Sequence, residues 1–142
     1  MGVAQLKKLD KFVARRRENW TYPREQLTQM ERYLILPEKE VNTEPSWFGF
    51  LITVREERPV SRDELVTHLE IHNIQTRPLF SGNLTRHPCF QALEERKDYR
   101  MTSLLSVTDQ IMSGSFWVGV YPGMEQAMLD EIVGCIQGRC ST

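Results

Sequence analysis

The chain has 142 residues, a length that suits one domain. Its 18 Lys and Arg against 19 Asp and Glu give a formal net charge of −1, which provides no electrostatic case for nucleic-acid binding. No apolar run approaches the roughly 20 residues of a membrane span, and the N-terminus lacks the apolar core of a signal peptide, so the sequence predicts a cytoplasmic protein without membrane contact.

The first predicted element is an amphipathic helix from about Val3 to Trp20, where apolar residues recur at helical spacing among Lys and Arg. Pro23 lacks a backbone donor and is expected to break or kink this helix near Tyr22. A helical stripe then continues to about Tyr33. It is carried by Leu27, Met30 and Leu34.

A polar connection from Pro37 to Pro45 separates the helical start from a predicted strand, Trp47 to Val54. That strand is rich in aromatic and β-branched residues and is expected to be apolar on both faces. Arg55 to Pro59 forms a charged turn. Ser61 and Glu64 then match a capping box, which predicts a helix to about His72.

The second half of the chain alternates short elements. Asn73 is expected to end the preceding helix in a left-handed conformation. The expected order is a strand over Ile74–Phe80, a short helix over Pro88–Leu93, a charged loop over Glu94–Asp98, a helix from Ser106 or Thr108 to Met112, a strand over Phe116–Tyr121 and a helix over Met124–Gln137. Gly138 is expected to follow that last helix as its C′ residue.

These elements predict an α+β fold: a small mixed or antiparallel sheet of about three strands with helices mainly on one face. Because the strands look apolar on both sides, the other face requires cover from a missing domain or subunit. Residues 1–36 are interpreted as a helical connection from such a domain, and residues 37–142 as a small C-terminal domain.

The stretch from Thr76 to Pro88 concentrates polar groups directly after a predicted strand. Gly82 allows a turn, and guanidinium groups bind phosphate with bidentate geometry. The candidate substrate-binding residues are Arg77, Ser81, Gly82, Asn83, Thr85 and Arg86. The competing interpretation is an ordinary loop whose two arginines pair with acidic neighbours.

Other chemical groups give weaker signals. His68 and His72 are spaced to share a helix face, but no third metal ligand is suggested by spacing, so no metal site is predicted. The odd set of three cysteines predicts reduced thiols rather than disulfides. They are Cys89, Cys135 and Cys140. Asp109 is expected to be a surface carboxylate without a shifted pKa. No nucleophile, phosphate-loop or metalloprotease motif is present, so no catalytic residue is assigned.

Several runs together resemble one known family. They are Pro45–Phe50, Thr76–Arg77, Leu79–Arg86 with Pro88, Thr108–Met112 and Phe116–Gly123, with the opening Gly2–Asp10 and Arg15–Asn19. The chain resembles the carboxy-terminal part of the CDP-4-keto-6-deoxyglucose-3-dehydrase group, within the DegT/StrS family of PLP-dependent nucleotide-sugar enzymes.

This resemblance implies the small domain of an aspartate-aminotransferase-like fold, the fold type I of PLP enzymes. It implies a homodimeric parent with cofactor PLP or PMP, bound mainly by the missing large domain, which removes the C3 hydroxyl of a 4-keto-6-deoxy nucleotide-sugar in deoxysugar or lipopolysaccharide biosynthesis. In the dehydrase group it also implies an iron–sulfur cluster, held outside this chain, and a flavin or iron–sulfur reductase partner.

Two other functions remain open from the sequence. A sugar aminotransferase of the same family would differ at a lysine-or-histidine position that these residues do not include. A non-catalytic small-molecule-binding or interaction module would retain the fold and lose the chemistry. By itself the chain is expected to be an inactive fragment that closes over and binds a nucleotide-sugar.

Overall fold

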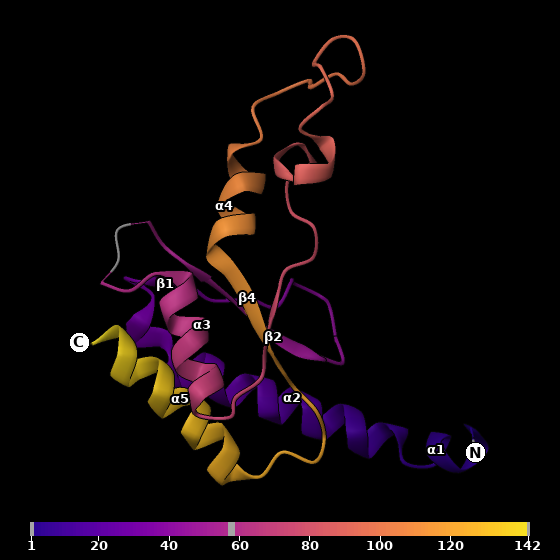
Figure 1. The fold of residues 1–142 in the computed structure, drawn as a ribbon. Coiled ribbons are helices and arrows are strands. Elements are labelled where there is room, and N and C mark those ends of the chain that lie inside the picture. The colour runs from indigo at the N-terminus through magenta and orange to yellow at the C-terminus, as the bar shows by residue number, and fades with distance from the viewer. Residues whose placement is uncertain (1, 57–58, 142) are drawn as a thin grey trace.

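A computed structural model describes residues 2–56 and 59–141. Its centre is a four-stranded sheet in the order β1–β2–β4–β3, with every neighbouring pair antiparallel (Figure 1). The strands are β1 (Leu34–Ile35), β2 (Gly49–Val54), β3 (Thr76–Pro78) and β4 (Ser115–Gly119). The predicted α+β class is confirmed, with four strands in place of about three.

The additional strand, β1, is only two residues long. Leu34 lies opposite Val54 and Ile35 opposite Thr53, so pairing with β2 defines β1 rather than any alternation of its own. The helical stripe predicted to continue to Tyr33 is therefore wrong in type. A 3₁₀ turn, η1 (Thr28–Met30), and β1 replace it, although its three apolar side chains are all buried.

Three helices cover one face of the sheet. α5 (Gln126–Cys140) packs against both α2 (Leu9–Gln26) and α3 (Arg62–Ile71). The side chains between sheet and helices are completely buried, and they include Phe50, Ile52 and Phe116 from the strands and Leu65, Leu69 and Ile136 from the helices. Burial of these apolar side chains is the main stabilising contribution to the fold.

The opposite face of the sheet is only partly covered. Leu51, Thr53 and Trp117 point to this side and are half-buried, so burial alternates along β2 instead of being complete on both faces. Phe48 remains 66% exposed and packs edge-on against Trp117 with ring centroids 5.4 Å apart. The predicted apolar second face therefore exists, but it carries little cover from this chain.

The N-terminal helix differs from expectation at its proline. α2 runs through Pro23 without ending, while the interruption falls earlier, between α1 (Gly2–Leu6) and α2. The predicted break near Tyr22 is wrong because proline's fixed φ suits a helix and buried packing around Pro23 compensates for one lost hydrogen bond. Nearby, the Trp20 ring stacks on the Trp47 ring with centroids 4.3 Å apart, so α2 packs against the connection before β2.

The predictions for the ends of the other two core helices, α3 and α5, had different outcomes. Ser61 and Glu64 form the predicted capping box at the start of α3, and Asn73 follows the helix with φ 60°. Both predictions are confirmed. Gly138, by contrast, lies inside α5, which continues until Cys140 is buried in the core. The apolar contact of Cys140 outweighs the modest helix preference against glycine.

Residues 79–114 form an arm that projects from the sheet and helices (Figure 1). It contains the 3₁₀ turns η2 (Leu84–Arg86) and η3 (Pro88–Phe90) and the helix α4 (Ser106–Gly114), which returns the chain to β4.

The predicted helix after Ser106 and the exposed loop at Glu94–Asp98 are confirmed. The charged turn predicted for Arg55–Pro59 lies partly outside the described residues. None of the described helices has both the length and the apolar character needed to cross a membrane.

Candidate functional site

The polar stretch singled out in the sequence lies where β3 leaves the sheet edge and the arm begins. β3 is shorter than the predicted strand, because only Thr76 to Pro78 pair with β4. Arg77 lies opposite Trp117 in this pairing, and its side chain is exposed. Within the described residues the side chain of Arg77 has no hydrogen bond or ion pair, so its guanidinium is available to an anion.

Gly82 shapes the turn that follows. Its φ of +61° lies in the left-handed region, as the sequence indicated. A Cβ placed there would come within 2.6 Å of the Cβ and Cγ atoms of Met112 in α4. The loop therefore lies directly on α4, and glycine is required both by the backbone angle and by this contact.

Asn83 is the most buried polar residue of the loop, with 4% exposure. Its Oδ1 accepts hydrogen bonds from the backbone N–H of Thr85 at 3.1 Å and from the Thr85 hydroxyl at 2.7 Å, so Asn83 caps η2. Its Nδ2 donates to Oδ1 of Asp109 at 2.6 Å. Asn83 thus joins the loop to α4 and positions its neighbours.

Arg86 completes this network from the surface. Its guanidinium donates to Oδ2 of Asp109 at 3.0 Å, while its side chain remains 67% exposed. The hydrogen bonds from Arg86 and Asn83 hold the pKa of Asp109 below its usual range. The expectation that Asp109 has no cause for a shifted pKa is therefore wrong, because its partners lie more than twenty residues away in the sequence.

Ser81 and His87 close the base of the loop. The ring Nε2 of His87 hydrogen-bonds the backbone carbonyl of Ser81, so this nitrogen carries the proton. The side chain of Ser81 stays exposed beside Gly82. Hydrogen bonds made by Asn83 and His87 therefore fix the loop, and Ser81 and Arg77 are exposed to solvent.

The predicted residues separate into two groups. Asn83, Thr85 and Arg86 meet in one network with Asp109, a residue that sequence reasoning did not assign to the site. Arg77 and Ser81 stand apart from that network. The two arginines therefore follow different interpretations. Arg86 pairs with an acidic neighbour, whereas Arg77 has no such pair among residues 2–56 and 59–141.

A lysine side chain can hold PLP as a Schiff base, and this chain has five lysines. All five are exposed, and two of them pair with glutamates on the surface, Lys39 with Glu44 and Lys97 with Glu94. A lysine that forms a Schiff base is instead desolvated in a pocket. Among the described residues no lysine has that environment, so none is suited to hold PLP as a Schiff base. The loop itself offers guanidinium, amide and hydroxyl groups, which are the kinds of group that bind an anionic ligand.

Comparison with known proteins gives a consistent result. The model of the DegT/DnrJ/EryC1/StrS aminotransferase family matches residues 1–137. The lipopolysaccharide biosynthesis protein RfbH of Salmonella typhimurium is 42% identical over 132 residues, which cover 93% of this chain and 29% of RfbH. The dTDP-4-dehydro-2,6-dideoxy-D-glucose 3-dehydratase of Saccharopolyspora spinosa is 41% identical over 136 residues, 96% of this chain and 28% of that enzyme.

Solved structures share the fold. An E. coli GDP-4-keto-6-deoxy-D-mannose-3-dehydratase with bound hydrated PLP superposes with a TM-score of 0.78 and 25% identity, over 95% of this chain and 33% of that one. A mutant GDP-4-keto-6-deoxymannose-3-dehydratase with bound GDP-perosamine has a TM-score of 0.78 at 26% identity, with the same coverage. The chain thus spans about 30% of the length of these relatives.

Proposed function

The chain belongs to the DegT/DnrJ/EryC1/StrS aminotransferase family, and from this membership we propose that it is the substrate-closing small domain of a PLP-dependent nucleotide-sugar 3-dehydratase. In this proposal residues 1–36 connect it to a large domain that binds PLP or PMP, and residues 37–142 close over the nucleotide-sugar. The parent removes the C3 hydroxyl of a 4-keto-6-deoxy sugar. When bound, the cofactor supplies the amine that activates the sugar's keto group.

The observation that carries the proposal is the loop at the start of the arm. Arg77 offers an exposed guanidinium that no side chain in the described part of the chain binds, and Arg86 lies nearby in sequence on a turn fixed by Asn83 and Asp109. A planar guanidinium suits the diphosphate of a nucleotide-sugar. Ser81 and Thr85 add hydroxyl groups, and Gly82 fixes the turn that presents them. These residues bind and orient substrate, and none is assigned a step in bond cleavage.

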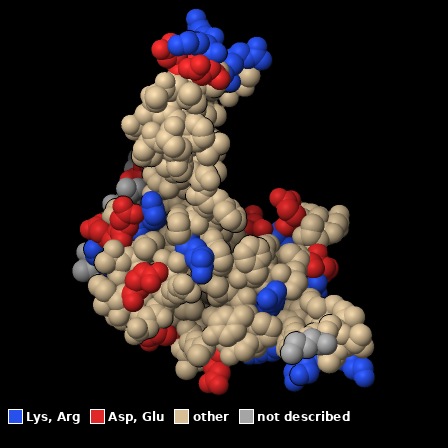
Figure 2. Space-filling view, turned by 45° about the vertical axis from the view of Figure 1, so that its right-hand side comes forward, with Lys and Arg blue, Asp and Glu red and all other residues tan. Residues whose placement is uncertain are grey.

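The arm supports the idea of closure. Phe80, Leu104 and Val107 are 88%, 90% and 67% exposed, so the arm presents several large apolar side chains to its surroundings. In Figure 2 the charged side chains gather at the tip of the arm, while the stem below it is free of Lys, Arg, Asp and Glu on the face drawn. Such a stem is suited to pack against the large domain or the second subunit of a homodimer.

The proposal is tested by titrating the chain with dTDP-glucose, CDP-glucose and GDP-mannose and following backbone amide chemical shifts. We expect shifts at Arg77 and Ser81 with at least one of the three. Arg77→Ala should weaken that binding roughly tenfold to a hundredfold, because a charge-assisted hydrogen bond contributes about 1.5–3 kcal/mol. Arg77→Lys should recover only part of the loss.

Arg100→Ala is the matched control, since Arg100 is another exposed arginine of the arm outside the loop. It should bind as the wild type does. Equal weakening by Arg77→Ala and Arg100→Ala would indicate general charge attraction and contradict a specific site, and so would an unchanged affinity for Arg77→Ala.

A sugar aminotransferase of the same family is the second candidate. GDP-perosamine synthase of Vibrio cholerae is 29% identical over 138 residues, which supports the shared domain. The higher identity to the Saccharopolyspora 3-dehydratase, 41%, favours the dehydratase. Partners such as an iron–sulfur reductase would act on the parent enzyme, outside the residues of this chain.

A further inference from the structure

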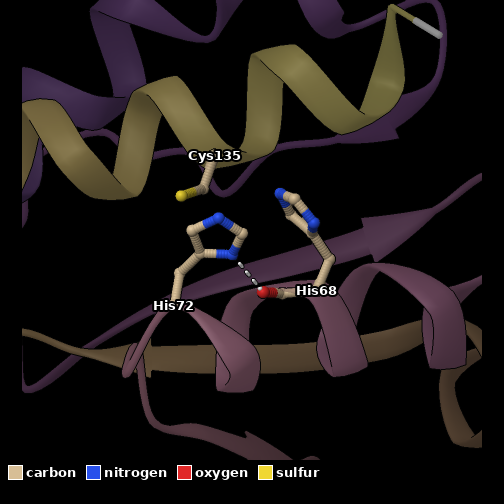
Figure 3. A group of neighbouring side chains, drawn as sticks. All are labelled: His68, His72 and Cys135. Atoms are coloured by element: carbon tan, nitrogen blue, oxygen red, sulfur yellow. Dashed lines mark hydrogen bonds between the residues drawn. The ribbon is translucent and has the colours of Figure 1, made fainter.

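Three side chains with metal-binding atoms meet between α3 and α5. His68 lies in the last turn of α3, His72 is its C-cap residue, and Cys135 lies in the middle of α5. Figure 3 shows the two rings and the thiol pointing toward one another in the space between these helices. One nitrogen from each ring and the Sγ atom all lie within 4.8 Å of one another.

The fold accounts for this meeting. A separation of four residues places His68 and His72 on one helix face, and their ring centroids are 4.3 Å apart. α5 packs along the same face and brings Cys135 to them from sixty-odd residues away in the sequence. The spacing of histidines and cysteines could not reveal this third group, because it comes from a different helix.

The histidine tautomer favours coordination. Nδ1 of His72 lies 2.8 Å from the backbone carbonyl of His68, and only a protonated Nδ1 can donate to a carbonyl oxygen. If the ring is neutral, its Nε2 then carries a lone pair, and Figure 3 shows that nitrogen on the side of the ring facing α5. A backbone carbonyl that fixes the second ring nitrogen is the usual support of a metal-binding histidine.

We propose that His68, His72 and Cys135 bind a thiophilic divalent transition-metal ion of the Zn²⁺ class. Imidazole nitrogen and thiolate sulfur are both ordinary ligands of Zn²⁺, and a site with three protein ligands leaves the fourth position to water. On binding, the Cys135 thiol loses its proton to solvent and the sulfur forms the metal bond, so the site gains one ion and releases one proton.

The distances are compatible with this chemistry. Bonds of about 2.0–2.1 Å to nitrogen and about 2.3 Å to sulfur place tetrahedral ligand atoms roughly 3.3–3.6 Å apart, so the present cluster closes by at most about 1.5 Å. His72 is exposed and can make this adjustment by side-chain rotation, whereas Cys135 is buried and stays in place.

The surroundings provide access and a polar neighbour. A hollow of about 700 Å³ is lined in part by His72 and Glu131, which gives an ion a route from solvent. Glu131 accepts a hydrogen bond from the Cys135 thiol at 3.4 Å and adds negative charge beside the sulfur. The bound ion would join α3 to α5, independently of the nucleotide-sugar loop, with which it shares no residue.

The experiment uses the whole chain after treatment with a chelator. Zn²⁺ alone is titrated in competition with a chromogenic chelator, and Co²⁺ is used as the spectroscopic probe. We expect one ion per chain, a higher midpoint of thermal unfolding with Zn²⁺, and a thiolate-to-cobalt charge-transfer band in the near ultraviolet.

Cys135→Ala should abolish that band and lower Zn²⁺ affinity by more than about tenfold, since loss of even a supporting group costs that much. His72→Gln should lower the affinity similarly while retaining the band, and its exposed position leaves the fold intact. Cys140→Ala, a buried cysteine of the same helix, and Cys89→Ser, an exposed one, are the controls and should keep the band.

Three results would overturn the proposal. The first is a Co²⁺ complex without a thiolate band. The second is Zn²⁺ affinity unchanged by both Cys135→Ala and His72→Gln. The third is loss of the band in Cys89→Ser with the band retained in Cys135→Ala. Far-ultraviolet circular dichroism of each variant separates loss of the site from loss of the fold.

Discussion

The body of the molecule and its arm use apolar residues in opposite ways. In the body, formed by the sheet with α2, α3 and α5, Phe50, Phe116 and Ile136 are completely buried. In the arm, residues 79–114, Phe80 and Leu104 are at least 88% exposed. On the helix-covered face of its sheet the body therefore satisfies its own hydrophobic contacts, whereas the arm leaves large apolar side chains available to another surface. The loop that we propose to bind the nucleotide-sugar lies at the junction between them.

The comparison is tested most strongly by a pair of phenylalanines. Phe116→Ala should lower the free energy of unfolding by about 3–5 kcal/mol, because it leaves a cavity in the core. Phe80→Ala should change it by less than about 0.5 kcal/mol, since the side chain is 88% exposed. Urea denaturation of both variants measures this difference. Equal effects would show that the arm is as tightly packed as the body.

Self-association tests the arm directly. The chain should associate as its concentration rises, and Phe80→Ser combined with Leu104→Ser should weaken this association by roughly tenfold or more, because burial of one such side chain contributes about 1.5–3 kcal/mol. Light scattering across a concentration series gives the mass. Ile71→Ser, which removes an exposed apolar residue of the body, is the control. A wild-type chain that stays at 16.7 kDa throughout would contradict the prediction.

Two glycines, one at the junction between arm and body and one in the body, test the comparison through stability. Gly82→Ala should destabilise the protein by about 1–3 kcal/mol, because alanine disfavours its φ of +61° and would overlap Met112. Gly134→Ala should instead stabilise it by about 0.5–1 kcal/mol, since Gly134 lies in α5 with nothing near its Cβ position. Thermal unfolding of the two variants should shift in opposite directions.

The smallest expected effect is the pH dependence of the junction. The pKa of Asp109 is lowered in the folded protein, so its bonds to Arg86 and Asn83 stabilise the protein above the unfolded pKa. That contribution is lost as pH falls through the lower, folded pKa. Asp109→Asn should therefore reduce the loss of stability in acid. Denaturation is measured from neutral to acidic pH for Asp109→Asn and for Asp10→Asn, which is the control for removing one carboxylate. The same pH dependence of stability in both variants would show that the network is unimportant.

Local signals in the sequence predicted much of the body. The capping box at Ser61, the left-handed Asn73 and the apolar stripe of α5 are encoded by neighbouring residues, and each appeared as expected. The elements that the sequence predicted wrongly depend on contacts between residues far apart in the chain. β1 exists only through its pairing with β2, and α2 continues through Pro23 because the core surrounds it.

The site was predictable to a similar degree. The cap at Asn83 and the left-handed Gly82 follow from residue type and order. The role of Asp109 required the return of α4 to the loop, and the approach of Cys135 to two histidines required the packing of α5 on α3. Such pairings depend on tertiary structure and have no local periodicity to reveal them.

The sheet order has a consequence for synthesis of the chain. β2 and β3 both pair with β4, and roughly 65 residues separate the end of β2 from the end of β4. At about 5–20 residues per second, a ribosome would leave β2 without this partner for roughly 3–13 s. During that interval Phe50, Ile52 and Val54 stay available to other molecules, so the nascent chain should depend on chaperones until β4 is made.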